Sequence, residues 1–258
     1  MRTRVKICGF TQIEEAVYAA HQGVDAIGLV FYAPSPRNVT IEQAINITNA
    51  LPAFTTVVAL FVNETEARIR EVLQQVPIDC LQFHGDEPAS ACRIYGKRYI
   101  KAVRMQATTN VAELAEQYHD AAGLLLDAYH ADAKGGTGQS FDWDLIPKQC
   151  ALPIILAGGL DATNAKQAIQ AVRPYALDVS SGVESSRGIK DASKVAAFIQ
   201  QVNVSIHTQP HPQSETHRRI EVGGLSLPIN EEVAAKDNDT DVSSSNLKIP
   251  LNGEVSDQ

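Results

Sequence analysis

At residues 5–11 the chain reads VKICGFT, a short apolar strand that stops at Cys8 and is followed by a glycine turn. A second run, LLLDA at residues 124–128, ends in the same way at Asp127. Functional groups concentrate in the loops that follow strands, so a thiol and a carboxyl group at two such ends suggest an acid and base pair. Each also has a structural interpretation, because such a cysteine can be a small buried apolar residue and such an aspartate a turn former.

The same alternation of a short β-branched run with a longer amphipathic stretch continues for about 200 residues, which is typical of βα units on a parallel sheet. The predicted strands are residues 4–8, 26–31, 55–62, 79–83, 99–103, 123–126, 154–157 and 176–179. The helices predicted between them include residues 12–21, 41–51, 64–75, 110–117, 162–171 and 191–202. Eight such units predict an α/β fold, a single (β/α)8 TIM barrel. A doubly wound open sheet is the alternative, but its G-x-G-x-x-G turn is absent after the first strand.

Composition limits the protein class. The 258 residues are 44% hydrophobic, enough for a full core, and the formal charge of −8 argues against a nucleic-acid surface. The four cysteines lack C-x-x-C spacing, which favours free thiols in a reducing cytoplasm over a metal site. No signal peptide and no run of about 18 apolar residues is present. We therefore expect a soluble cytoplasmic protein without metal, nucleic acid or membrane contact.

The character of the chain changes at about residue 203. Residues 203–258 are rich in Ser, Asn, Asp, Pro and Gln, and they contain nine acidic and four basic side chains. This composition predicts a disordered acidic tail that follows a barrel domain at residues 1–202. The tail histidines, His207, His211 and His217, have no cysteine or clustered carboxylate beside them, which favours a solvated tail over a metal site.

Polar residues follow the predicted strands, where a barrel of this class places its active site. They are Cys8, residues 35–37, Asn63, His84, Arg104, Asp127 and Asp178. Lys6 lies two residues before Cys8, so both side chains point to the same face of the strand. We expect the Lys6 ammonium to lower the pKa of the Cys8 thiol and favour the thiolate.

Glycine-bearing turns follow the last three predicted strands. Their backbone N–H groups can approach an anion closely, and barrels often bind phosphate in the loops after strands seven and eight. The sequence thus predicts a phosphorylated small molecule as the ligand. The turn residues expected to bind it are Gly136, Gly158, Gly159, Ser180, Ser181 and Gly182.

Two further polar residues have alternative interpretations. Arg37 follows Ser35 and Pro36 in a loop, and its flat guanidinium suits two-point binding of a carboxylate. It can also be a solvated surface arginine, which is the usual state of this residue. His84 is either a ligand contact or a residue of the turn that begins there.

Taken together, these segments resemble the phosphoribosylanthranilate isomerase family of tryptophan biosynthesis. The matching segments are KICG at 6–9, GLVF at 28–31, SPR at 35–37, VALFVN at 58–63, LQFHG at 81–85, GGTG at 135–138, LAGGL at 156–160 and DVSSGVE at 178–184. They span the predicted barrel in order. The resemblance does not reach the residues from about 203 onward.

The resemblance implies a cofactor-free Amadori rearrangement of N-(5-phosphoribosyl)anthranilate to 1-(2-carboxyphenylamino)-1-deoxyribulose 5-phosphate. Carried over by position, Asp127 is the general acid that protonates the furanose oxygen, and Cys8 is the general base that removes a proton from ribose C2. The resemblance also implies that Arg37 binds the anthranilate carboxylate, that Asp178 contacts the substrate, and that the late glycine turns hold the phosphate.

Two other functions are alternatives to this one. The related isomerase of histidine biosynthesis has aspartates at both catalytic strand ends, and Cys8 argues against it. A barrel that only binds phosphosugars would need neither Cys8 nor Asp127 nor Arg37. Barrels of this kind occur as monomers or dimers, so we expect a monomer or a homodimer.

Overall fold

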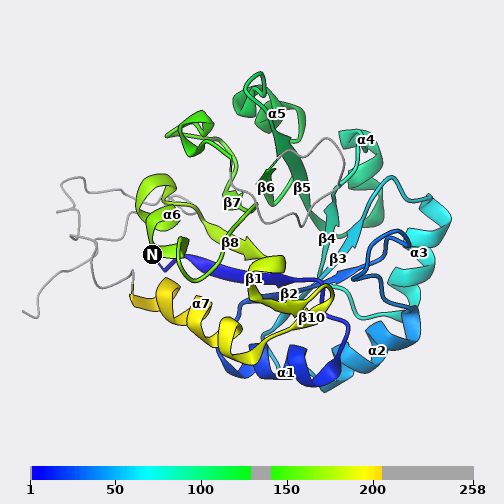
Figure 1. Ribbon diagram of the computed structural model, residues 1–258. Coiled ribbons are helices and arrows are strands. Elements are labelled where there is room, and N and C mark those ends of the chain that lie inside the picture. Colours follow the sequence, from blue (N-terminus) through cyan, green and yellow to red (C-terminus); the bar gives the residue numbers. More distant parts are fainter. Residues whose placement is uncertain (1, 129–140, 205–258) are drawn as a thin grey trace, which may run out of the picture. The chain divides into compact units, whose positions relative to one another are not determined.

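The computed structural model describes residues 2–128 and 141–204, in which eight parallel strands close a barrel in chain order with helices outside it (Figure 1). The strands are β1 Arg4–Cys8, β2 Ala26–Val30, β3 Thr56–Phe61, β4 Cys80–Phe83, β5 Arg98–Met105, β6 Gly123–Ala128, β7 Ile154–Leu156 and β8 Ala176–Val179. The α-helices are α1 Ile13–His21, α2 Ile41–Ala50, α3 Glu66–Gln75, α4 Ala89–Cys92, α5 Val111–Gln117, α6 Ala165–Val172 and α7 Ala192–Val204. The predicted (β/α)8 barrel is confirmed.

The strands read as continuous apolar runs because both of their faces are covered. All six residues of β6 are buried, for example. Outward-facing residues such as Leu124 pack in the layer between the strands and the helices, whereas Leu125 belongs to a smaller cluster inside the barrel. The two layers together form the core.

Side chains alternate between the two faces of each strand, so polar residues two positions beyond an inward-facing residue also face inward, at the mouth of the barrel. Leu125 and Ala176 lie in the inner cluster, and Asp127 and Asp178 follow them by two residues. These carboxyl groups therefore face inward at the carboxyl ends of β6 and β8. The barrel interior is therefore apolar, and its end at the carboxyl termini of the strands is polar.

Helix starts agree with the sequence because the capping chemistry is local. Thr40 and Gln43 form a capping box at the start of α2, and the side chains of Thr65 and Asn110 accept hydrogen bonds from the first turns of α3 and α5. The strands and helices that the sequence predicts lie within three residues of those observed. Helix α7 ends at Val204, two residues beyond the predicted boundary of the barrel domain.

Three features depart from the regular alternation. A short α4 and the 3₁₀ helix η1, Arg93–Tyr95, follow β4, and the described residues between β6 and β7 contain only the 3₁₀ helix η2, Trp143–Leu145. After β8 comes a 3₁₀ turn η3, Ser181–Val183, and a two-stranded hairpin of β9, Glu184–Ser186, and β10, Ile189–Lys190. The hairpin was not predicted, because its strands are too short to produce an apolar pattern. The predicted tail from residue 205 onward lies outside the described residues.

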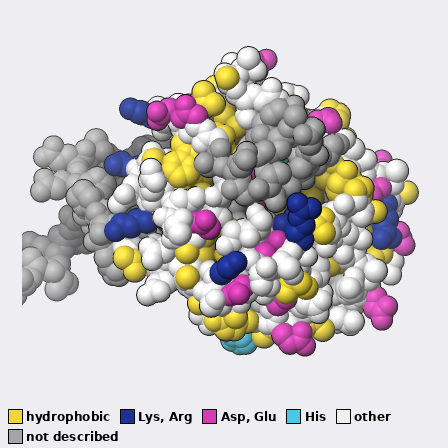
Figure 2. All heavy atoms as spheres, viewed as in Figure 1, with side chains coloured by type: hydrophobic (Ala, Val, Ile, Leu, Met, Phe, Trp, Pro, Cys, Tyr) yellow, Lys and Arg dark blue, Asp and Glu magenta, His cyan; other side chains and the backbone are white. Residues whose placement is uncertain are grey.

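The surface in the view of Figure 2 carries acidic and basic side chains interspersed with one another. Neither sign forms a continuous band over the described residues of this face. Among the described residues, no helix is long and apolar enough to cross a membrane.

Candidate active site

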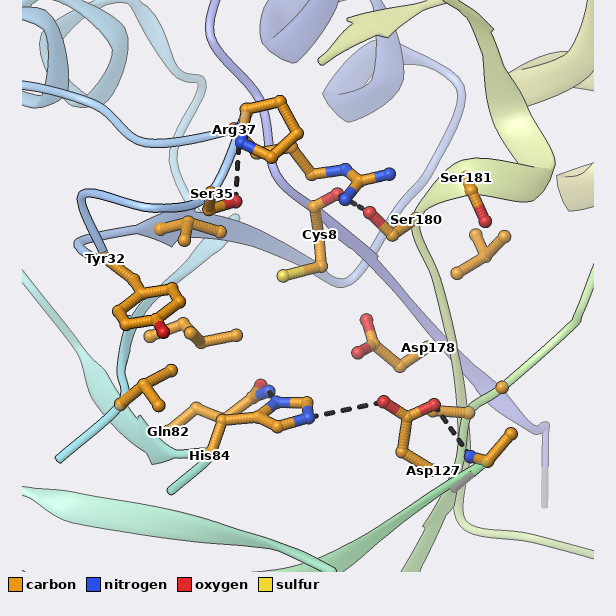
Figure 3. Close-up of a pocket in the computed structure, with 18 of the residues that line it drawn as sticks. Cys8, Tyr32, Ser35, Arg37, Gln82, His84, Asp127, Asp178, Ser180 and Ser181 are labelled. Carbon is orange, nitrogen blue, oxygen red and sulfur yellow. Dashed lines mark hydrogen bonds and ion pairs between the residues drawn. The ribbon is translucent and has the colours of Figure 1, made fainter. Parts of the chain in front are cut away.

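A cavity of about 440 Å³ opens at the carboxyl ends of the strands. Cys8, Arg37, His84, Asp127 and Asp178, each of which the sequence places in the site, all line it (Figure 3). Each is at most 8% exposed. The structure therefore brings together residues that are up to 170 positions apart in the chain, as Cys8 and Asp178 are.

The Cys8 thiol lies at the end of β1 and points into the cavity (Figure 3). Room for its sulfur comes from Gly28 on the neighbouring strand, where a Cβ atom would lie 2.7 Å from Sγ. The backbone carbonyl of Cys8 accepts hydrogen bonds from Ser180 Oγ at 2.9 Å and from Lys190 Nζ at 2.6 Å. Strand pairing on one side and these two donors on the other fix the position of the thiol.

The prediction of a lowered pKa for Cys8 is wrong, because the net pKa of the thiol is raised. Burial raises the pKa of the thiol, and this effect exceeds the attraction of the Lys6 ammonium, which acts downward as expected. Lys6 is itself paired: its Nζ donates to Asp178 Oδ1 at 2.9 Å across the β1–β8 contact. Asp178 opposes the thiolate, so the ion pair offsets part of the help that Lys6 gives.

The sign of this shift predicts how the resting thiol reacts. Because only the thiolate is alkylated and the Cys8 pKa is raised, iodoacetamide should modify Cys8 slowly at pH 7. The rate should then rise about tenfold per pH unit to beyond pH 9. Peptide mass spectrometry over a pH series measures this for Cys8 separately from the other cysteines. Half-maximal reactivity below about pH 8.5, the ordinary thiol value, would contradict the prediction.

Asp127 is held by two contacts on its two oxygens. Its Oδ1 accepts from the backbone N–H of Ala128 at 2.9 Å, and its Oδ2 lies 3.2 Å from His84 Nε2, although that N–H is not well aligned with the oxygen. Gly158 makes space beside it, because a Cβ there would lie 2.5 Å from the backbone nitrogen of Ala128 and 3.1 Å from Asp127 Oδ1. A buried carboxyl group with room in front of it is suited to exchange a proton with a ligand.

Arg37 is a buried residue rather than a solvated one, and it forms a two-point ion pair with Glu184. Its Nε and Nη2 donate to the two Glu184 oxygens at 2.7 and 2.8 Å. Lys190 Nζ donates to the same carboxylate at 2.8 Å. Although burial acts to raise the pKa of Glu184, the charges of Arg37 and Lys190 hold it below its ordinary value. The guanidinium plane is thereby fixed with its remaining edge free of Glu184.

The sequence did not identify Glu184 or Lys190 as residues of the site. Both belong to the hairpin after β8, and Glu184 is 147 positions from Arg37. The one available signal was Glu184 itself, an acidic residue that directly follows the SSGV turn.

The turns predicted to bind phosphate are placed at the cavity with one exception among the described residues. Gly158, Gly159, Ser180 and Ser181 line it. Gly182 does not; it packs against the backbone carbonyl of Leu160 and so brings the loops after β7 and β8 together. Gly136 lies outside the described residues.

Two members of the predicted polar ring lie beside the cavity and do not line it. The backbone N–H of Asn63 donates to Glu87, and Arg104 Nη2 donates to the backbone carbonyl of His84 at 3.3 Å. Glu87 also accepts from Lys101 at 2.9 Å and from the backbone N–H of Gly85. These contacts fix the loop that carries His84. Within residues 2–128 and 141–204, no three His, Cys, Asp or Glu side chains are grouped so as to hold a metal ion.

Comparisons with known proteins match the sequence of this chain and its fold. The family model for N-(5'phosphoribosyl)anthranilate isomerase matches residues 5–201. The N-(5'-phosphoribosyl)anthranilate isomerase of Nitrosococcus oceani is 53% identical over 203 residues, which cover 79% of this chain and 98% of the relative. The crystal structure of phosphoribosyl anthranilate isomerase from Thermotoga maritima superposes with a TM-score of 0.73 at 38% identity, covering 78% of this chain and 99% of that one.

Another solved structure holds a ligand: a phosphoribosyl anthranilate isomerase in complex with reduced 1-(o-carboxyphenylamino)-1-deoxyribulose 5-phosphate. It has a TM-score of 0.67 at 36% identity and covers 78% of this chain and 99% of that one. The family model matches nearly the whole described barrel, and the relatives are above 50% identical over nearly their full length. These two findings decide the family. The chain belongs to the N-(5'-phosphoribosyl)anthranilate isomerase family.

Proposed function

We propose that this protein converts N-(5'-phosphoribosyl)anthranilate to 1-(2-carboxyphenylamino)-1-deoxyribulose 5-phosphate, a step of tryptophan biosynthesis. The observation that carries the proposal is the cavity itself: in a chain of this family, a thiol, a carboxyl group and an arginine line one pocket beside two glycine turns. A barrel that only binds a phosphosugar has no need of this set. The rearrangement moves hydrogen within one molecule, so these side chains suffice for its proton transfers.

The reaction needs two proton transfers at different atoms. In the first, Asp127 gives its proton to the furanose oxygen as the C1–O bond breaks, and the nitrogen lone pair forms a C1=N imine. In the second, the Cys8 thiolate takes the proton from C2, and the electron pair of that C–H bond forms the enolamine. Tautomerisation of the enolamine then gives the ketone. Each such transfer contributes about 10² to 10⁴ to the rate.

Burial disfavours the Cys8 thiolate in the resting protein, and ring opening changes this balance. The imine nitrogen gains positive charge, which stabilises a thiolate nearby. We therefore infer that the base becomes effective only once the sugar has opened.

The two ends of the substrate are assigned to different residues of the cavity. Glu184 occupies Nε and Nη2 of Arg37, which leaves Nη1 and the second N–H of Nη2 to bind the anthranilate carboxylate. The turns at Gly158, Gly159, Ser180 and Ser181 are assigned to the phosphate. Asp178, paired with Lys6, is assigned a polar contact to the substrate between the two ends.

Replacement of Arg37 by alanine should raise KM about 10- to 100-fold, because a charge-assisted bond contributes roughly 1.5–3 kcal/mol. kcat should change little, since the carboxylate is remote from the reacting carbons and is held in ground and transition states alike. The matched control is a substrate: N-(5'-phosphoribosyl)aniline lacks the carboxylate, so its KM should be the same for wild type and variant. Equal KM values for the natural substrate would contradict the assignment.

The direct test of the function is turnover by the purified full chain. The fluorescence of the anthranilate group should fall with time as substrate is consumed, and chromatography should show the ketone product. A binding protein would instead give a saturable change in fluorescence without product. That second result would overturn the proposed function.

The domain boundary also remains a prediction. Val195, Phe198, Ile199 and Val202 of α7 are buried against the barrel, so a chain that ends after Val204 should retain wild-type kcat and KM. Thermal unfolding should change by no more than a few degrees. A loss of activity, or a large fall in the melting temperature, would show that residues 205–258 contribute to the enzyme.

The cytoplasmic location and the choice between monomer and homodimer stay predictions as well.

A further inference from the structure

Gln82 is the most completely buried polar residue of the cavity wall, with 0% of its surface exposed. Its amide Nε2 lies 3.0 Å from His84 Nδ1, while its Oε1 has no hydrogen-bond partner among the described residues. A buried acceptor without a partner destabilises a fold by about 1–3 kcal/mol, and a methionine or leucine of similar size would avoid that cost. The contact at the other end of the amide therefore calls for a functional explanation.

The chemistry of the two groups gives this contact a direction. An amide nitrogen carries two hydrogens and only donates, so Nδ1 of His84 must present its lone pair. A neutral imidazole then has its single hydrogen on Nε2. This is the nitrogen that lies 3.2 Å from Asp127 Oδ2 (Figure 3). The donors thus run in one direction, from Gln82 to His84 to Asp127.

The reverse arrangement is less favourable. With the amide rotated, Oε1 would accept from an Nδ1–H, and the unprotonated Nε2 would face the carboxylate oxygen with a second lone pair. If Asp127 were protonated, its O–H would point at Nε2, and the acid proton would be committed to the histidine. In either case Asp127 is poorly prepared to give a proton to a ligand.

The ring has little freedom to correct this by itself. The backbone N–H of His84 donates to Phe61 and its carbonyl accepts from Arg104, so the loop is held at both groups. Gln82 and His84 are two residues apart and so face the same side of the chain. The amide is therefore the described group that acts on Nδ1.

We propose that Gln82 is a positioning residue that holds neutral His84 in the Nε2–H form, so that the imidazole donates to Asp127 Oδ2. With Oδ1 already bound to the Ala128 N–H, the acid proton of Asp127 is left to face the substrate. The Nε2–H of His84 is imperfectly aligned with Asp127 Oδ2. Catalytic hydrogen bonds often reach good geometry only in the complex with substrate. The link to catalysis rests on the proposed function; the state of the histidine does not.

The first test reads the histidine directly. In ¹⁵N-histidine-labelled full-length protein, the His84 resonances are identified by their loss in His84→Phe. When the ring is neutral, they should show a proton on Nε2 and none on Nδ1. In Gln82→Glu a carboxylate, which only accepts, replaces the amide, and Nδ1 should become protonated. An Nδ1–H form in wild type, or an Nδ1 unchanged by Gln82→Glu, would overturn the proposal, whether or not the protein is an active isomerase.

The second test uses kinetics and a variant that keeps the shape of the residue. Gln82→Met removes the donor together with the unpartnered oxygen, so the protein should fold at least as well as wild type. Contacts that orient a metal-ligating imidazole are worth about 10- to 100-fold. We expect an effect of the same size here, so kcat should fall by that factor while KM stays within about threefold. Gln74→Met, on the exposed surface of α3, is the matched control and should have wild-type kinetics.

A double-variant comparison separates positioning from direct contact with the substrate. In the His84→Phe background, Gln82→Met should change kcat by less than about twofold, because Gln82 acts through His84. A further loss of 10-fold or more in that background would overturn the proposal. A wild-type kcat for Gln82→Met in an active enzyme would do so too. An inactive wild-type chain would overturn the proposed function instead, and the spectra of wild type and Gln82→Glu would still decide the histidine.

Discussion

Cys8→Ala should lower kcat by at least about 10² to 10⁴ while KM changes by no more than a few-fold. In the proposed mechanism the thiolate acts on the C2 proton only in the transition state, so its removal costs little substrate affinity. The alanine side chain differs by one sulfur atom in a site where Gly28 already provides space, which keeps the fold intact. Steady-state kinetics with a thermal unfolding measurement on the same sample gives both results.

The barrel offers a matched control for this substitution. Cys80 also faces the barrel interior, and burial raises its pKa to about 11, but it does not line the cavity. Cys80→Ala should therefore keep kcat within about threefold of wild type. Cys8→Ser should be nearly as poor as Cys8→Ala, because a hydroxyl is a much weaker base. A Cys8→Ala enzyme with near-wild-type kcat would remove the cysteine from the mechanism.

Asp127→Asn should be as damaging, with a loss in kcat of about 10² to 10⁴ despite an almost unchanged shape. The asparagine oxygen can still accept from the Ala128 N–H, but the amide has no acidic proton for the furanose oxygen. Its NH2 group would also face the N–H of His84, where the carboxylate oxygen now lies. The assay is the initial rate at saturating substrate, compared with Asp161→Asn, which changes an aspartate outside the cavity lining.

The pH profile gives Asp127→Asn an independent check. In wild type, kcat requires a protonated acid and an ionised base, so it should follow a bell whose limbs belong to the pair jointly. The variant should lose the alkaline limb in whatever slow turnover remains. A profile that keeps this limb would assign the acid to another residue, with His84 the first to test.

The fold and the positions of Cys8 and Asp127 in the cavity could be predicted from the sequence because their signals are local. Strand and helix periods, Thr40 and Thr65 before helices, and polar residues at strand ends all act over a few positions. Cys8 and Asp127 stand out because each interrupts an apolar run. Parallel strands then bring all such ends to one side of the barrel, so local signals become a site.

The electrostatics could not be predicted because they depend on partners that are remote in the chain. Lys6 pairs with a carboxylate 172 positions away, and that pairing decides how much of its charge is left for Cys8. Burial of the thiol has the larger effect, and the depth of a strand end in a closed barrel is a property of the whole fold. Gln82 is a different case. The sequence places it two residues before His84, but no local signal predicts which ring nitrogen its amide contacts.

The hairpin after β8 also bears on how this enzyme can change. Through Glu184 and Lys190 it joins the arginine assigned to the substrate carboxylate to the carbonyl of the cysteine assigned as base. The arginine assigned to substrate selectivity and the cysteine assigned to reactivity are therefore held by the same hairpin. Lys190, and not Arg37, contacts the Cys8 carbonyl, so a library that varies Arg37 alone to accept a new substrate should leave the base in place. Laboratory evolution toward other amino-sugars should succeed less often when Lys190 is varied together with Arg37.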